Sequence, residues 1–107
     1  MDYLGNYAAG QPVYCFWDSF DSTGASLAPS VAGQVRVYKD NSTTEDTAGV
    51  TDTRNFDTVT GIHLATISTL GAFYASGHDY AIILQGSTLD GRTVSKVLGA
   101  FSIGNRV

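Results

Sequence analysis

Residues 74–86, YASGHDYAIILQG, contain an uninterrupted apolar run at residues 80–84 and decide the fold class of this chain. The run is five residues long, includes two isoleucines and lies between Gly77 and Gly86. A short apolar run between turn residues is typical of a buried strand, whereas a helix would need ten or more residues without such glycines. We therefore expect a central β-strand here, mostly covered on both faces, with neighbouring strands supplied by the other apolar segments.

The composition is that of one globular domain. A chain of 107 residues, 43% hydrophobic and 15% charged, can bury a core of its own and is not typical of a disordered protein. Its net charge of −4 and scattered basic residues argue against a nucleic-acid partner, which requires Lys and Arg gathered on one face. The sequence lacks the pattern of a secretory signal and the ~20 apolar residues of a membrane span, so we expect no membrane association.

Turn residues separate further segments with the β-branched and aromatic content of strands. These segments are residues 12–20, 34–40, 50–56, 62–67 and 93–103. Two hairpins are expected, one joining residues 50–56 to 62–67 and one closed by the Asp90-Gly91 pair. Gly99 predicts a bulge in the last strand. Residues 41–49 are expected to form an exposed connection. The pattern predicts an all-β fold, an immunoglobulin-like antiparallel β-sandwich of six to eight strands, with a small barrel as the alternative.

The N-terminus differs from the rest of the chain. We divide the sequence into an arm or edge strand at residues 1–11 and a β-sandwich domain at residues 12–107. The arm carries three large apolar side chains, Tyr3, Leu4 and Tyr7, without a clear strand period. A terminus is usually mobile unless it is tied down, and tyrosine is enriched in interface cores. Either the arm orders against a neighbouring subunit through these residues, or it folds back as an edge strand of its own sandwich.

Three residues should mark the core. Trp17 is predicted as a large core side chain, although immunoglobulin domains place theirs one strand later. Tyr80, at the start of the central strand, predicts a tyrosine corner, in which the phenol bonds the backbone just upstream. Cys15 is the single cysteine and has bulky neighbours, so we expect a buried, unreactive thiol without an intrachain disulfide.

Few side chains could carry catalysis. His63 lies in the middle of a strand, which favours a hydrogen-bonded structural histidine, and the adjacency of His78 and Asp79 does not aim both side chains at one substrate. No nucleophile, zinc or phosphate-binding motif occurs. Four acidic residues lack the spacing of a calcium loop: Glu45, Asp46, Asp52 and Asp57. We therefore expect no enzymatic activity, no cofactor and no metal site.

Five segments carry a family resemblance. They are GQPVYCFWDSFDSTG (10–24), VRVYKDNSTTEDTAGVT (35–51), FDTVTGIHLATI (56–67), FYASGHDYAIILQGSTLDGRTV (73–94) and GAFSI (99–103). Together they resemble small immunoglobulin-like virion proteins of tailed bacteriophages and, more distantly, the N-terminal module of phage upper baseplate proteins. The resemblance implies a structural or accessory virion protein, in head decoration or in the tail or baseplate, assembled in the host cytoplasm. Its partners would be capsid or tail proteins and copies of itself.

A second function stays open from the residues alone, a carbohydrate-binding module that attaches particles to a host-surface glycan. Sugar binding requires exposed aromatic side chains beside polar groups, and the available residues are Tyr14, Tyr38 and Tyr74. Each of them also fits cross-strand packing. Two or three aromatic side chains on one exposed sheet face would favour the glycan, whereas an arm lying on a partner chain would favour the structural role.

Overall fold

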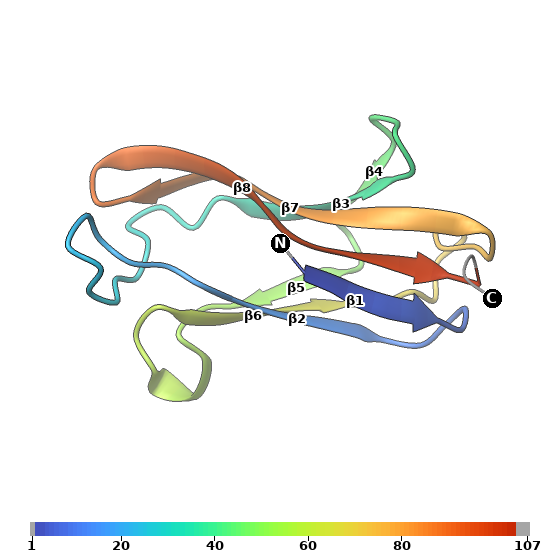
Figure 1. Ribbon diagram of the computed structural model, residues 1–107, viewed down its shortest axis with the longest axis horizontal. Coiled ribbons are helices and arrows are strands. Elements are labelled where there is room, and N and C mark those ends of the chain that lie inside the picture. Colours follow the sequence, from blue (N-terminus) through green and yellow to red (C-terminus); the bar gives the residue numbers. More distant parts are fainter. Residues whose placement is uncertain (1, 105–107) are drawn as a thin grey trace.

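Two β-sheets pack face to face in the computed structural model, which describes residues 2–104 (Figure 1). The larger sheet has the strand order β1-β8-β7-β3-β4 and the smaller one the order β2-β6-β5. The strands are β1 (Asp2–Tyr7), β2 (Val13–Asp18), β3 (Gln34–Lys39), β4 (Glu45–Asp46), β5 (Val50–Thr53), β6 (Ile62–Ile67), β7 (His78–Leu89) and β8 (Arg92–Ile103), with a 3-10 turn, η1 (Phe56–Thr58), before β6. The predicted all-β sandwich is confirmed. Residues 1 and 105–107, which the predicted arm and sandwich include, lie outside the described residues.

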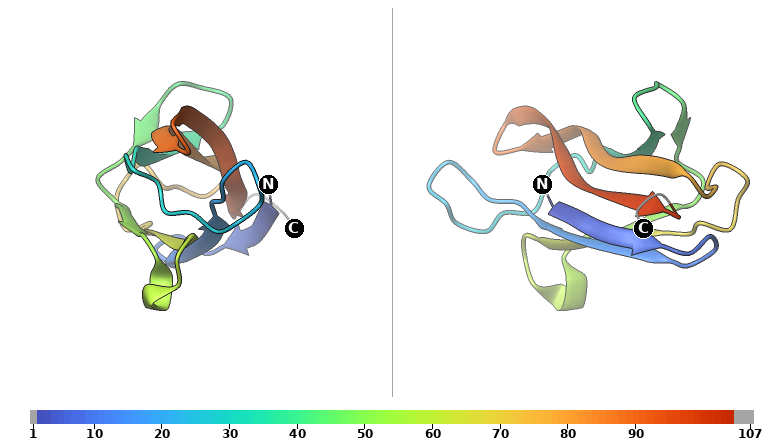
Figure 2. Two further views of the ribbon diagram at one scale, coloured as in Figure 1. Left: turned by 90° about the vertical axis from the view of Figure 1, so that its left-hand side faces the viewer. Right: turned by 45° about the vertical axis from the view of Figure 1, so that its right-hand side comes forward.

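The strand order is that of an immunoglobulin-like sandwich. The second, fifth and sixth strands form one sheet, while the third, seventh and eighth lie side by side in the other, with the short β4 added beside β3. One pairing differs from the expected antiparallel arrangement, because β1 runs parallel to β8. The pairings among the other described strands are antiparallel. Strand β1 therefore closes the side of the sandwich near β2 (Figures 1 and 2).

The predicted central strand lies in the interior of the larger sheet, between β8 and β3. Tyr80, Ile82 and Leu84 are buried, whereas Ala81 and Ile83 between them are half-buried. Both faces of residues 80–84 are thus mostly covered, as expected, although the second face is covered less completely than the first. In an antiparallel sandwich each sheet turns only one face to the core, so side chains alternate between the core and the surface. The strand is also longer than expected, because its hairpin with β8 extends it to Leu89.

Local signals in the last hairpin are confirmed. Asp90 and Gly91, with φ of 52° and 73°, form the turn that connects β7 to β8. Further along, Ile82 is opposite Gly99 and Ile83 is opposite Val97, which leaves Leu98 as an extra residue. This is the predicted bulge, and it turns the side chain of Leu98 into the core.

The core contains the three expected residues. Trp17 is 7% exposed and Cys15 is buried on the same inner face of β2. The Tyr80 hydroxyl accepts a hydrogen bond from the Ala75 N–H at 2.8 Å and donates to the Phe73 carbonyl at 3.1 Å. This geometry confirms the tyrosine corner. The burial of Cys15 is also confirmed, while its low reactivity stays a prediction.

The structure decides between the two alternatives for the N-terminus in favour of the edge strand: residues 2–7 form β1, because pairing with β8 bonds their backbone and the half-buried Leu4 and Tyr7 pack against the core. Two other local expectations were wrong. Residues 41–49 are not entirely an exposed connection, since they contain the two-residue strand β4 paired with β3. The strand expected at residues 12–20 spans only β2, because the backbone turns at Asp21 through an Asx-type turn in which its carboxylate accepts from the Thr23 N–H.

Candidate functional site

The structure separates the three tyrosines predicted to bind sugar. Tyr14 is 55% exposed on β2 of the smaller sheet, and Tyr38 lies half-buried on β3 of the larger sheet. Tyr74 is buried, and its hydroxyl donates to a carboxylate oxygen of Asp46 at 2.7 Å. Burial and this carboxylate raise the pKa of Tyr74, so its phenol stays protonated. The three residues share no surface and cannot form one sugar platform.

A different group of aromatic residues lies on the outer face of the smaller sheet. Side chains of β2 alternate, so Tyr14 and Phe16 point outward while their neighbours point to the core. Phe16 is 57% exposed and stands opposite Leu64 of β6. Phe56, from η1, meets the Phe16 ring edge-on with 5.2 Å between centroids. We call this surface the aromatic face and define it by Tyr14, Phe16, Phe56, Ile62 and Leu64.

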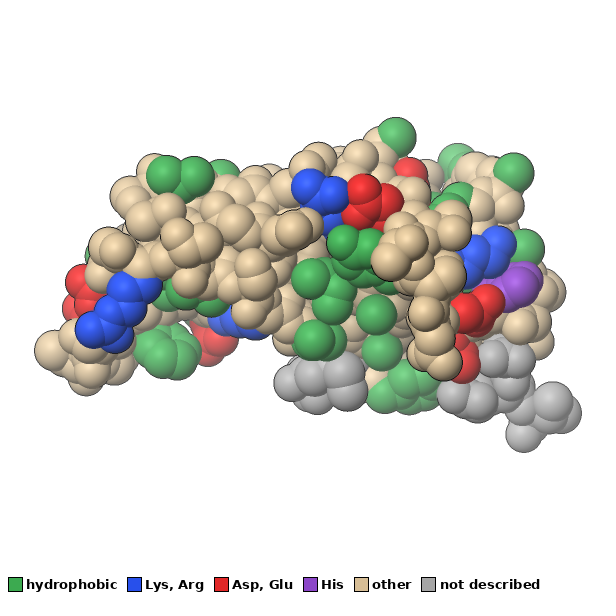
Figure 3. Space-filling view, turned by 90° about the horizontal axis from the view of Figure 1, so that it is seen from above, with side chains coloured by type: hydrophobic (Ala, Val, Ile, Leu, Met, Phe, Trp, Pro, Cys, Tyr) green, Lys and Arg blue, Asp and Glu red, His purple; other side chains and the backbone are tan. Residues whose placement is uncertain are grey.

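The outer face of the larger sheet has another character. Figure 3 shows this side of the molecule, with charged side chains of both signs beside a group of hydrophobic side chains in the middle of the face. Arg36 of β3 donates to both carboxylate oxygens of Glu45 on β4, at 2.8 and 3.0 Å. The aromatic face contains no such ion pair and no Lys or Arg. The two outer faces therefore suit different contacts.

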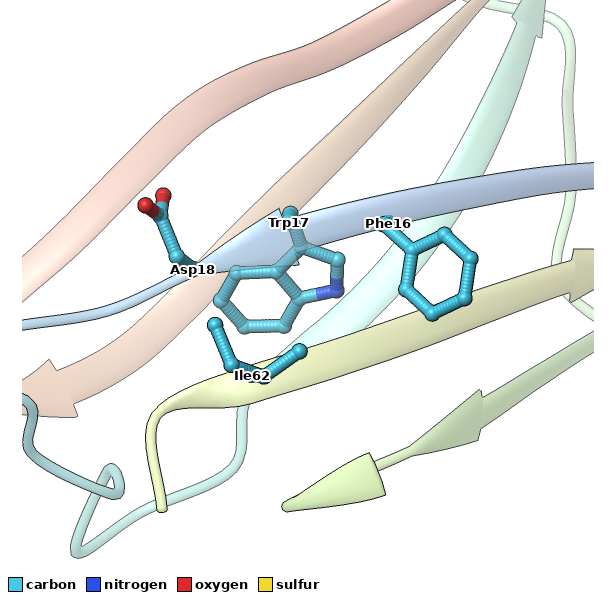
Figure 4. A pocket seen from close by; sticks show the side chains of 4 residues that line it. All are labelled: Phe16, Trp17, Asp18 and Ile62. Atoms are coloured by element: carbon cyan, nitrogen blue, oxygen red, sulfur yellow. The ribbon is translucent and has the colours of Figure 1, made fainter. Parts of the chain in front are cut away.

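A hollow of about 320 Å³ lies at one end of the aromatic face and is lined by Phe16, Trp17, Asp18 and Ile62 (Figure 4). The figure shows the indole of Trp17 between the Phe16 ring and the Asp18 carboxyl group. Two cations lie near this indole, with Arg54 4.6 Å and Lys96 5.3 Å from its ring centroid. Aromatic, aliphatic and carboxylate groups thus meet in one surface depression.

His63 is held as a neutral, hydrogen-bonded residue. Its Nδ1 accepts from the Asn55 N–H at 3.1 Å, so the ring proton must be on Nε2, which lies 2.7 Å from the Ser19 hydroxyl. That hydroxyl in turn donates to the Leu27 carbonyl at 2.6 Å. Burial, and next the charge of Arg54, lower the pKa of His63. Because Nε2 donates to Ser19, this pair is not arranged as a base and its nucleophile.

His78 pairs with a residue that the sequence did not suggest. Its Nδ1 lies 2.8 Å from a carboxylate oxygen of Asp40, the residue after β3, so its side-chain partner is Asp40 and not the neighbouring Asp79. The other Asp40 oxygen accepts from the Asp79 N–H at 3.1 Å. These hydrogen bonds, above all that with His78, hold the pKa of Asp40 below its usual value. The pair is exposed at the end of the sheet and does not line the hollow at the aromatic face.

The acidic residues that could have gathered around a cation are kept apart. Among residues 2–104, no three His, Cys, Asp or Glu side chains are grouped as metal ligands. Asp46 accepts from Tyr74, and Asp52 pairs with Arg54. Within the same residues, no helix is long and apolar enough to cross a membrane.

The fold and the site define an immunoglobulin-like β-sandwich that exposes an aromatic face on its smaller sheet. No protein-family model, curated protein or solved structure matches this chain. The sequence did contain a signal for the aromatic face, the alternation of bulky residues along β2, but it did not tell which side of that strand points inward.

Proposed function

We propose that this protein is a non-enzymatic structural or accessory component of a tailed-phage virion, in the head decoration or the tail or baseplate. It acts by docking on other virion proteins through its aromatic face. The observation that carries the proposal is the exposure of Tyr14 and Phe16 side by side on the smaller sheet. The resemblance to phage immunoglobulin-like proteins supports the virion setting.

Burial of this face would be energetically favourable. Water-exposed aromatic rings gain about 25 cal/mol for each Å² of apolar surface removed from water. Aromatic residues are enriched in the buried centre of protein interfaces, while charged residues are depleted there. The aromatic face has this composition, since its five members are aromatic or aliphatic, and the charged Asp18 lies at its end. In this proposal the aromatic face, rather than a free N-terminal arm, makes the contact with other virion proteins.

The test is incorporation into particles of the phage that encodes the chain. A double variant, Tyr14→Ser with Phe56→Ser, should be lost from purified particles, while its melting temperature falls by no more than about 7 °C, because Tyr14 is exposed and Phe56 loses chiefly its edge-on contact with Phe16. Tyr38→Ser, on the opposite sheet, is the matched control and should be incorporated normally. Full incorporation of the double variant would rule out docking through the aromatic face.

A further inference from the structure

The hollow at the end of the aromatic face shares Phe16 and Ile62 with that face and has the features of a small-ligand site. We propose that it receives the ring of one neutral sugar, held between Phe16 and Ile62 with its hydroxyls directed to Asp18. This inference goes beyond the proposed docking function and does not depend on it. It also moves the sugar-binding residues away from the tyrosines expected from the sequence.

The size and walls of the hollow suit a single ring. Its volume of about 320 Å³ is near the lower end of small-molecule sites, which are commonly built from apolar and aromatic walls with a few polar groups. Phe16 and Ile62 provide the apolar walls, and Trp17 borders the hollow from the core side of β2 (Figure 4). A pyranose has C–H groups on its faces, which pack on aromatic rings, and hydroxyl groups around its edge.

Asp18 supplies the polar group that such a ligand requires. Its side chain is exposed, and the ion pairs found within residues 2–104 do not include its carboxylate. An ionised carboxylate only accepts hydrogen bonds and offers about four lone-pair sites. Sugar hydroxyls are donors that can use these sites. An entirely apolar ligand would leave the carboxylate without such a partner.

The surrounding charges favour a neutral ligand. Two positive groups, Arg54 and Lys96, lie by the indole. Two negative groups belong to the smaller sheet: Asp18 is the last residue of β2, and Asp52 lies on β5. Both positive groups already donate elsewhere, Arg54 to Asp52 and Lys96 to the Asp18 carbonyl at 2.8 Å. With opposite charges balanced and the cations engaged, neither an anion nor a cation would gain much.

Lys96 also argues against an extended peptide as the occupant. Strand β2 is an edge of the smaller sheet, and a peptide could bind it by pairing with free backbone groups. The Lys96 ammonium donates a hydrogen bond to the Asp18 carbonyl, at the end of β2 that borders the hollow, so this carbonyl is already bonded. Lys96 reaches this edge from β8 of the larger sheet, and a charged group placed over an edge strand is a common way in which proteins prevent such pairing.

The experiment uses Trp17, the single tryptophan of the chain, as its reporter. Methyl α-glucopyranoside, methyl β-galactopyranoside and N-acetylglucosamine are titrated while the Trp17 emission is recorded. We expect a saturable change with at least one of them, with a dissociation constant in the millimolar range. Asp18→Asn and Phe16→Ala should each weaken binding by about tenfold, while Tyr38→Ala should leave it unchanged. Thermal melts confirm that each variant is folded.

Three results would overturn the assignment. The first is no saturable response to any of the three sugars. The second is that the Asp18→Asn and Phe16→Ala variants bind the sugar as tightly as the wild-type protein does. The third is a saturable response to N-acetyl-phenylalaninamide but not to sugars, which would assign the hollow to a side chain of a protein partner. The docking test uses Tyr14 and Phe56, which do not line the hollow, so failure of one proposal leaves the other standing.

Discussion

Removing the hydroxyl of Tyr80 should destabilise the sandwich by about 2 kcal/mol. In the Tyr80→Phe variant the ring keeps its stacked contact with Phe101, at 5.1 Å between centroids. The hydrogen bonds of the hydroxyl are lost: it accepts from the Ala75 N–H, and its proton is shared between the Phe73 and Ala75 carbonyls. Tyr80 is only 2% exposed, so water cannot easily replace its hydroxyl. A buried group left without its partner costs about 1–3 kcal/mol, which sets the expected magnitude.

The assay is urea and thermal unfolding, followed by Trp17 emission and far-UV circular dichroism. For 107 residues, an unfolding entropy of about 2.1 cal/mol/K per residue gives about 225 cal/mol/K, so 2 kcal/mol corresponds to a decrease of about 9 °C in Tm. Tyr14→Phe is the matched control, because that phenol is exposed, and it should change stability by less than about 0.5 kcal/mol. If Tyr80→Phe is as stable as this control, the tyrosine corner does not stabilise the fold.

Three further predictions concern the backbone, the first strand and pH. Gly61→Ala should lower the free energy of unfolding more than Gly24→Ala does. Both glycines have positive φ, but of the two only Gly61 would place a Cβ 2.7 Å from a main-chain oxygen. Equal urea midpoints of the two variants would contradict this. Deleting residues 2–9 should lower Tm strongly, since it removes β1 from β8, and an unchanged Tm would argue for a free arm. Because the folded pKa of His63 lies below its ordinary 6.5, only the unfolded chain gains a proton just below that pH. The free energy of unfolding should therefore be highest above about pH 6.5 and fall towards pH 5. In urea unfolding, the His63→Gln variant should show a weaker dependence on pH. An equally steep fall in the variant would contradict the role given to His63.

The fold class could be predicted because its signals are local. The Asp90-Gly91 turn, the glycine at the β8 bulge and the short apolar run of β7 each specify backbone geometry within a few residues. Tyr80 could be assigned to a tyrosine corner for the same reason, since its hydrogen-bond partners lie only five and seven residues upstream.

The parallel strand and the site could not be predicted from such signals. The pairing of β1 with β8 joins residues almost a whole chain apart, and Gly5 interrupts the strand period of β1. In β2 both sides of the strand are bulky, so alternation alone does not distinguish core from surface. Only packing decides that Trp17 is inside and Phe16 outside. The hollow needs Ile62 from β6 as well, which pairing brings opposite Asp18.

The proposed binding residues lie on the outer face of the smaller sheet, away from the core that both sheets build, which makes the proposed sites experimentally separable from the fold. The tyrosine corner, the stacked Phe101 and the long hairpin belong to the larger sheet, whereas the aromatic face and the hollow belong mainly to the smaller one. Phe16 is 57% exposed, and its recorded ring contact is the edge-on pair with Phe56, an interaction of about 0.5–1.5 kcal/mol. Phe16→Ala should therefore lower the free energy of unfolding by no more than about 1.5 kcal/mol. A larger loss in urea unfolding would mean that Phe16 supports the core, and its use as a binding probe would then fail.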